Sequence, residues 1–296
     1  MDFSYYFQYF LSGLTNGSTY IIVAIGFNII YNSTGIINFA QGEFLMLGAM
    51  TTVSYLKFMP LALAIICAVF TTMLIGFLID LLFIRTLHKP TVLKMIIITI
   101  GLSIIIQELA LHIWDEKVKT LPYFTGSLDT TIKIFNAYIS PQVLWVLGSS
   151  IFIIIILNLF FKYSLIGKAM RACAVNKEVA RLCGINTKNI ISLSFIISSG
   201  IGAFAGCVIT PLSQVQYNCG TPIAIKGFTV AILGGLGNNN GAIIAGIFLG
   251  IIESFSILFL PLAYKEAIAT IILLIILICK PSGFLGKKEL QSLKEF

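Results

Sequence analysis

The stretch "GSTYIIVAIGFNIIYNSTGIINFAQGEF", residues 17–44, determines what kind of fold this chain can adopt. Apart from its last two residues, it lies in a run from Phe3 to Gly42 that contains no charged residue. Glu43 follows, and the next charged residue is Lys57. A helix that crosses the ~30 Å hydrocarbon core of a bilayer needs about 20 apolar residues. The run is therefore long enough for one membrane span and the beginning of a second.

The whole chain has the composition of a membrane protein. Of its 296 residues, 58% are hydrophobic and only 10% are charged, whereas soluble domains have roughly 25% charged residues. Backbone groups lack water partners in lipid, so the spans should be helices. We predict a single all-α polytopic transmembrane domain over residues 1–296, a bundle of about eight or nine helices. The expected spans are 9–31, 36–56, 60–84, 93–113, 142–161, 190–211, 223–237, 241–260 and 265–279.

Lysine and arginine gather in a few loops, which predicts the orientation. The basic regions are 85–94, 162–188 and the tail from Lys280, and they should face the cytoplasm. Nine spans with the N-terminus outside and the C-terminus in the cytoplasm satisfy this rule. The same loops account for the net charge of +7 without nucleic-acid binding. The six scattered cysteines and two histidines show no metal-ligand spacing, so we expect no metal site.

Two features predict how the helices pack. Small residues recur at every fourth position in 242–254 and in 198–206, which favours close helix–helix approach. The segment 223–237 is short and rich in glycine, and it is either a re-entrant segment or a short crossing. The positive-inside rule favours a short crossing or a broken helix, which in membrane proteins often borders a transport site. We expect Lys226 near its outer end, with the ammonium group reaching the interface.

The loop 162–190 has helical character in its middle. Ala172, Val175, Val179 and Leu182 would share one face of a single amphipathic helix, with Gly184 as its C-cap. Such a helix could lie on anionic lipid headgroups or dock on a cytoplasmic partner. The small residues on it favour docking, because they permit close approach.

Four motifs, in order, resemble one family. "GSTYIIVAIGFNIIYNSTGIINFAQGEFLMLGA" (17–49), "GKAMRACAVNKEVARLCGIN" (167–186), "GFTVAILGGLGNNNGAIIAGIFLGIIES" (227–254) and "KPSGFLG" (280–286) are similar to the permease subunits of bacterial ABC importers of the branched-chain amino acid type. The resemblance covers the chain from about residue 10 to residue 286, and it is to the first of that system's two permeases.

The resemblance implies a machine of several chains in the bacterial inner membrane. It assigns Arg171, Ala172, Ala180 and Gly184 to a loop that couples the permease to two cytosolic ATPase subunits. A second permease subunit and an extracytoplasmic solute-binding protein would complete the importer. ATP and magnesium would bind to the ATPases, since "GGLGNNNG" (234–241) lacks the lysine and the preceding strand of a phosphate-binding loop. The chain itself is then a transport subunit and not an enzyme.

Polar residues deep in the spans are the candidate pathway residues. A carboxylate inside the membrane costs about 2.5–3.5 kcal/mol and needs partners or water. Asn38, Gln41 and Glu43 would stand at about 0°, 300° and 140° on a regular helix and so would not share a face, unless the helix breaks at Gly42. Glu253 is a second deep carboxylate. These four residues either line the translocation pathway or form a structural hydrogen-bond network, and Glu43 could pair with a neighbouring helix or subunit. Asp80 and Arg85 read as charges at the membrane boundary.

The resemblance favours branched-chain or related amino acids as the solute, and similar permeases serve urea or short amides. A secondary transporter driven by an ion gradient is the alternative from another class. It would need more ionisable groups at mid-membrane than this chain has. The sequence leaves open whether two copies of this chain or two different permeases pair.

Overall fold

The computed structural model describes residues 3–87, 91–127, 130–134, 137–259, 261, 264–280 and 282–286. Helices make up nearly all of its regular structure. The helices are α1 (Phe3–Thr34), α2 (Gln41–Tyr55), α3 (Leu61–Ile79), the π-helical turn η1 (Asp80–Ile84), α4 (Val92–Trp114), α5 (Pro141–Tyr163), α6 (Leu165–Val175), α7 (Lys177–Leu182), α8 (Thr187–Ser213), α9 (Gly220–Gly234), α10 (Asn239–Ser256) and α11 (Lys265–Cys279). Two short strands, β1 (Ile132–Ile134) and β2 (Ala137–Ile139), complete the list.

Each of the nine predicted spans corresponds to a helix, so the all-α polytopic fold is confirmed. Within the described residues, six helices are long and apolar enough to cross a membrane: α1, α3 with η1, α4, α5, α8 and α10. The helices α9 and α11 are shorter apolar helices, and α2 also has only 15 residues. The predicted short segment 223–237 is thus a helix that begins and ends three residues earlier than expected.

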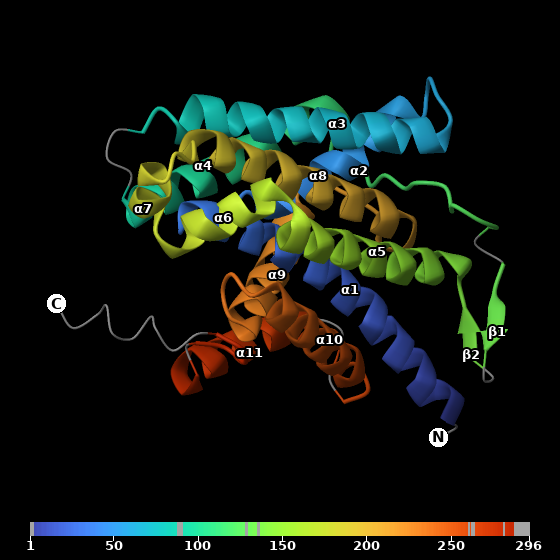
Figure 1. The fold of residues 1–296 in the computed structure, drawn as a ribbon. Coiled ribbons are helices and arrows are strands. Elements are labelled where there is room, and N and C mark those ends of the chain that lie inside the picture. The colour runs from blue at the N-terminus through green and yellow to red at the C-terminus, as the bar shows by residue number, and fades with distance from the viewer. Residues whose placement is uncertain are drawn as a thin grey trace.

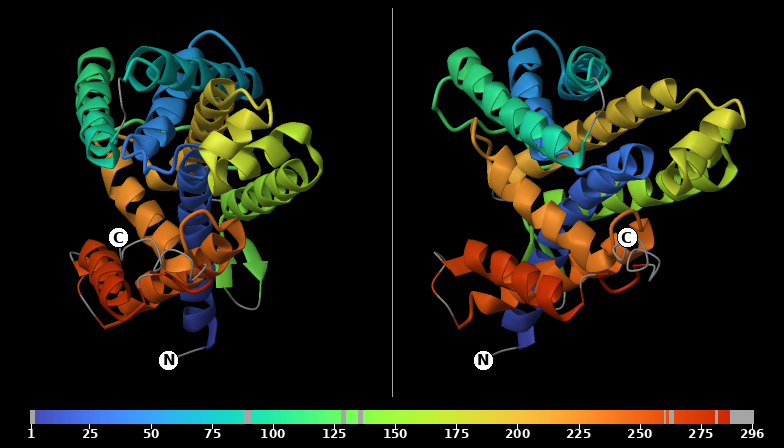
Figure 2. Two further views of the ribbon diagram at one scale, coloured as in Figure 1. Left: turned by 60° about the vertical axis from the view of Figure 1, so that its left-hand side comes forward. Right: turned by 90° about the vertical axis from the view of Figure 1, so that its left-hand side faces the viewer.

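The helices form one bundle with distinct ends (Figure 1). The long helices α3, α8 and α5 run side by side, and α6 and α7 lie at one end of them. At the opposite end, the loop after α4 carries an antiparallel β1–β2 hairpin that the sequence did not predict, with Ile132 opposite Ile139. The helices α9, α10 and α11 gather around α1 on the other side of the molecule, as the turned views show (Figure 2).

Local capping residues explain where several helices begin. Ser140 accepts a hydrogen bond from the backbone of Gln142, and Pro141 occupies the first turn of α5. The side chain of Asn238 caps α10 by accepting from the backbone of Asn240 and Gly241. Thr91 caps α4 in the same way. These caps satisfy N–H groups that have no partner inside their own helix.

Small residues allow the central helices to touch backbone to backbone. A methyl group at Gly17 of α1 would lie 2.6 Å from the carbonyl oxygen of Gly246 in α10. Methyl groups at Gly48 and Gly206 would overlap the backbones of Ala203 and Leu45, where α2 crosses α8. The predicted role of the small-residue stripes in 242–254 and 198–206 is confirmed. Such contacts hold membrane helices together, because lipid supplies no hydrophobic force between them.

The short helices α2 and α9 begin inside the bundle. Gln41, the first residue of α2, is hydrogen-bonded to Ser198 in the middle of α8. Thr221, at the start of α9, is hydrogen-bonded to Gln107 in the second half of α4. The non-helical segments before them, 35–40 and 214–219, therefore run alongside long helices. Irregular backbone is tolerated at such depth only where protein or a water-filled cavity surrounds it.

The α2–α8 crossing gives a direct test of this packing. We expect Gly48→Ala to lower the thermal unfolding temperature of the purified protein by several degrees, because overpacking a tight contact costs about 1–3 kcal/mol. Gly148→Ala in α5 is the matched control, since a methyl group there meets nothing within 4 Å. Thermal melts in one detergent would compare them, and equal melting temperatures would contradict the close approach.

Candidate translocation site and coupling loop

Glu43 lies at the meeting point of three helices. Its side chain is completely buried near the start of α2. One carboxylate oxygen, Oε1, accepts hydrogen bonds from Ser103 Oγ at 2.9 Å and Gln107 Nε2 at 2.8 Å, both on α4, and from Thr221 Oγ1 on α9 at 3.1 Å. The other oxygen, Oε2, has no hydrogen-bond partner among the described residues. Glu43 thus pairs with neighbouring helices of its own chain through neutral donors.

A groove of about 300 Å³ lies directly over this cluster, between α4 and α9. The three side chains that bind Glu43 also line the groove and form its polar floor. The remaining lining side chains are apolar: Phe39, Ile100, Ile104, Ala224, Ile225 and Phe228. Apolar walls with a few convergent polar groups are typical of a small-molecule site. We call this feature the α4–α9 groove.

Asn38 and Gln41 lie apart from the α4–α9 groove. The assumption of a regular helix from Asn38 was wrong, because α2 begins at Gln41 and continues through Gly42 without a break. Asn38 Oδ1 instead accepts from the backbone of Ala40 at 3.2 Å and forms a turn before the helix. Gln41 Oε1 accepts from Ser198 Oγ at 2.6 Å, and Ser198 also contacts the carbonyl of Gly26 in α1 at 2.9 Å. Gln41 therefore links α1, α2 and α8.

Glu253 of α10 belongs to a buried ion pair. Its Oε1 lies 2.7 Å from Nζ of Lys226 in α9, and its Oε2 accepts a hydrogen bond of 2.6 Å from the hydroxyl of Tyr20 in α1. Lys226 is only 9% exposed, so the expectation that it reaches the interface at a span end was wrong. Its ammonium group also lies 5.5 Å from the centre of the Tyr20 ring. The three residues hold α1, α9 and α10 together.

A second charged cluster joins η1 to the start of α8. Asp80 is completely buried and accepts a hydrogen bond from Ser192 of α8. Arg85 Nε lies 3.4 Å from Asp80 Oδ2, and the Arg85 guanidinium donates to Ser192 Oγ at 2.7 Å. Asp80 is therefore a buried and paired carboxylate, and its position at the membrane boundary stays a prediction.

The loop 162–190 contains two short helices and not the single helix we predicted. Asn176 has extended backbone angles, φ −155° and ψ 113°, which end α6. Its side chain then caps α7 by accepting from the backbone of Glu178 at 2.9 Å and Val179 at 3.0 Å. Asparagine competes for backbone hydrogen bonds in this way, which the apolar spacing alone does not reveal.

The exposed surface of this loop carries large apolar side chains beside charged ones such as Arg171 and Arg181. Val175 is 86% exposed and Leu182 is 87% exposed, and Val179 is also exposed. The residues that face the bundle are Gly167, Met170, Cys173 and Ala180. The predicted apolar face therefore points away from the chain's own core, with Ala172 partly buried at its edge.

The four candidate coupling residues occupy different positions on this loop. Arg171 is exposed on α6, whereas Ala180 is 4% exposed and seats α7 against α8. Gly184 ends α7 with a φ of +82°, and the backbone of Ile185 bonds to the carbonyl of Ala180 at 3.1 Å. This is a C-cap that favours glycine, so the predicted helix end at Gly184 is confirmed.

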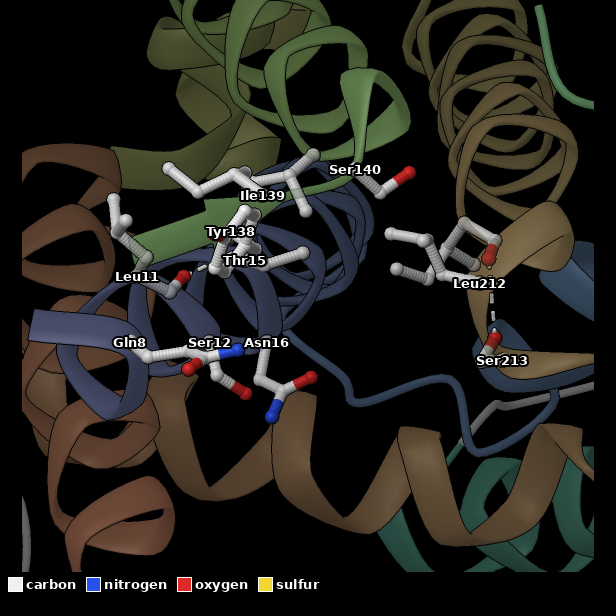
Figure 3. A pocket seen from close by; sticks show the side chains of 12 residues that line it. Gln8, Leu11, Ser12, Thr15, Asn16, Tyr138, Ile139, Ser140, Leu212 and Ser213 are labelled. Carbon is white, nitrogen blue, oxygen red and sulfur yellow. Dashed lines mark hydrogen bonds between the residues drawn. The ribbon is translucent and has the colours of Figure 1, made fainter. Parts of the chain in front are cut away.

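A second hollow, of about 320 Å³, lies at the end of the bundle that carries the β-hairpin (Figure 3). Gln8, Ser12 and Asn16 line it from one side of α1, and Tyr138 and Ser140 line it from the hairpin and its end. The side chains that line it are all neutral, and it shares no lining residue with the α4–α9 groove.

Sequence reasoning identified Glu43 and Glu253 but missed their partners. Ser103 and Gln107 stand four residues apart in an apolar span, which places both on one face of a helix. That spacing was the available signal. Thr221 gave no comparable signal, because its partner Glu43 lies 178 residues away in the sequence. Lys226 gave none either, because its partner Glu253 is on another helix, 27 residues away.

A bundle of membrane-spanning helices with buried polar clusters and a two-helix loop at one end defines a polytopic membrane protein of the transporter class. Residues 9–277 match the family described as branched-chain amino acid transport system permease component, and the chain belongs to this family.

Individual relatives agree with this assignment over nearly the full length. The chain is 32% identical to the high-affinity branched-chain amino acid transport system permease protein LivH of Salmonella typhimurium, covering 98% of each chain. It is also 32% identical to the corresponding permease BraD of Pseudomonas aeruginosa, covering 97% of this chain and 98% of the relative. A probable branched-chain amino acid transport permease protein LivH of Methanocaldococcus jannaschii is 26% identical over 90% of this chain. No solved structure shows significant similarity to the chain.

The buried ion pair makes a prediction about stability. Lys226→Met should destabilise the bundle by about 3–5 kcal/mol, because it leaves the Glu253 carboxylate buried without its cation. The double variant Lys226→Met with Glu253→Leu should recover much of this loss, since both charges are then removed. Thermal melts of the three proteins would test this, and a double variant no better than the single one would contradict the pairing.

Proposed function

We propose that this chain is the transmembrane permease subunit of an ATP-driven importer that depends on a solute-binding protein and moves branched-chain or related amino acids across the bacterial cytoplasmic membrane. The observation that carries the proposal is the match to the permease family over residues 9–277. The named relatives carry branched-chain amino acids in their descriptions, and they support the choice of solute.

The two-helix loop supports docking on cytosolic ATPase subunits. Val175, Val179 and Leu182 are apolar side chains whose exposure to water is unfavourable, and Arg171 is also exposed on α6. An apolar patch with a charged border is typical of a protein interface. In the proposed complex, two ATPases bind this loop and supply ATP and magnesium, with the loop and the C-terminus in the cytoplasm and the N-terminus outside.

The α4–α9 groove supports a second permease subunit. Gln107 is half-buried and Thr221 is exposed in this groove, and polar groups that face lipid cost free energy. A second permease, or a water-filled pathway between two permeases, would remove this cost. The extracytoplasmic binding protein would deliver the solute at the end of the bundle that carries the β-hairpin.

The proposal is tested by purifying the tagged chain from its own membranes in mild detergent and identifying its partners by mass spectrometry. Recovery of two ATPase subunits and a second permease supports the importer. Recovery of the intact chain alone, with uptake that follows an ion gradient, would contradict it in favour of a secondary transporter. Uptake assays with the matching binding protein would then separate amino acids from urea and short amides.

Variants of the coupling loop test the ATPase interface. We expect Arg171→Glu and Gly184→Val to insert into the membrane normally but to lower ATP-dependent uptake about tenfold. Arg171→Glu reverses an exposed charge, and valine at the positive φ of Gly184 costs about 1–2 kcal/mol and displaces the end of α7. Uptake and ATP hydrolysis in proteoliposomes would be compared with Gly148→Ala as the control. Normal uptake by both loop variants would contradict the docking role.

A further inference from the structure

We infer that Glu43 provides the negative charge that receives the α-ammonium group of the transported amino acid, and that the α4–α9 groove holds its aliphatic side chain. The inference rests on the proposed function and adds a solute site to it. The site consists of the Glu43 carboxylate and the apolar walls that α4 and α9 form, and together they suit a small zwitterion with an apolar side chain.

The charge of the buried carboxylates is balanced at two positions and unbalanced at Glu43. Three carboxylates are completely buried among the described residues: Glu43, Asp80 and Glu253. Asp80 has Arg85 and Glu253 has Lys226 as the cation. Glu43 has only neutral donors, and no lysine or arginine of the described ranges forms an ion pair with it. A buried carboxylate without a cation is costly, so a cation from outside the chain would be favoured there.

The Glu43 carboxylate also has unused hydrogen-bonding capacity. All three donors share Oε1, whereas Oε2 is buried and has no partner among the described residues. Oε2 lies against the start of α9, where a methyl group at Gly220 would come within 2.5 Å of it. Helix N-termini favour a negative charge, so the starts of α2 and α9 help to keep the carboxylate in place. A bound ammonium group would bring three further donors to this carboxylate.

Gln107 belongs both to the Glu43 cluster and to the lining of the groove. Gln107 is half-buried, and its Nε2 binds both Glu43 Oε1 at 2.8 Å and Thr221 Oγ1 at 2.5 Å. It therefore connects the carboxylate to the lining of the groove. In the inferred complex the ammonium group of the solute takes the place of this side chain on Oε1, and the hydroxyl of Thr221 is a second acceptor.

The walls of the α4–α9 groove have the size and the apolar chemistry to hold an aliphatic side chain. The rings of Phe39 and Phe228 pack at a centroid distance of 5.5 Å and close one part of the groove. Ile104 and Ile225 face it from α4 and α9. A groove of about 300 Å³ lies at the lower end of the size range for small-molecule sites. It suits one aliphatic amino acid, whereas urea and short amides have neither an ammonium group nor a branched side chain.

The test uses the complete importer with its partner subunits in proteoliposomes. We expect Glu43→Gln to lower leucine uptake about tenfold, which corresponds to about 1.4 kcal/mol, while ATP hydrolysis stimulated by the loaded binding protein persists. Glutamine keeps the size and an acceptor oxygen, so a purely structural role would leave uptake intact. Ser150→Ala in α5 is the matched control, because it removes a buried hydroxyl that does not line the groove and keeps the charge of Glu43, and it should transport normally.

The outcomes separate this inference from the proposed function. If the wild-type importer takes up no amino acid, the proposed function fails. If the wild type takes up leucine and Glu43→Gln does so equally well, the role of Glu43 is overturned while the function stands.

A second measurement does not depend on the assembly of the Glu43→Gln variant. A cysteine introduced by Ile225→Cys should react at least about tenfold faster with a cationic methanethiosulfonate than with an anionic one, after subtraction of the reactivity of the parent protein. Turnover with leucine should slow the cationic reaction. Equal rates for the two reagents, or faster reaction with the anionic one, would overturn the inference.

Discussion

The close approach of helix backbones at small residues is the constraint on which the rest of this structure depends. Lipid offers no hydrophobic force to bring helices together, so contact area and hydrogen bonding must do so. Gly17 against Gly246, and Gly48 against Ala203, place α1 on α10 and α2 on α8 with nothing between the backbones. The starts of α2 and α9 are close enough that Gly42 and Gly220 also touch. Larger side chains at these positions would separate the helices and pull the buried polar groups out of reach of one another.

That proximity is what makes the polar clusters possible. Lys226 meets Glu253 and Tyr20 because α9 and α10 both lie against α1. Glu43 accepts hydrogen bonds from α4 and α9 because the short helices α2 and α9 both start inside the bundle. Two of the clusters are balanced ion pairs and serve the fold. The third, around Glu43, has a charge without a cation and stands behind an open groove. This difference supports the proposal that the first two clusters serve the fold and that the third takes part in transport.

The sequence predicted the helices well and their interior contacts poorly. Runs of apolar residues located all nine spans, and basic loops and glycine stripes are local signals of the same kind. Ser103 lies 60 residues from its partner Glu43 in the sequence, and Tyr20 lies 233 residues from its partner Glu253. No local sequence pattern encodes such a pairing. The two-helix loop was missed for a different reason. Asn176 fits an amphipathic wheel, yet its side chain captures backbone N–H groups and begins a new helix. The helical wheel correctly placed Gln41 and Glu43 on different faces, but it did not apply to Asn38, because the helix begins only at Gln41.

The central claim is that solute passes along the face of this chain formed by α4 and α9. The most direct measurement is a cryo-EM reconstruction of the assembled importer, trapped during turnover with an amino acid and its binding protein. The account predicts solute density between α4 and α9 beside Glu43, with the second permease covering the groove. Solute density on another face, with the α4–α9 groove open to lipid, would contradict it.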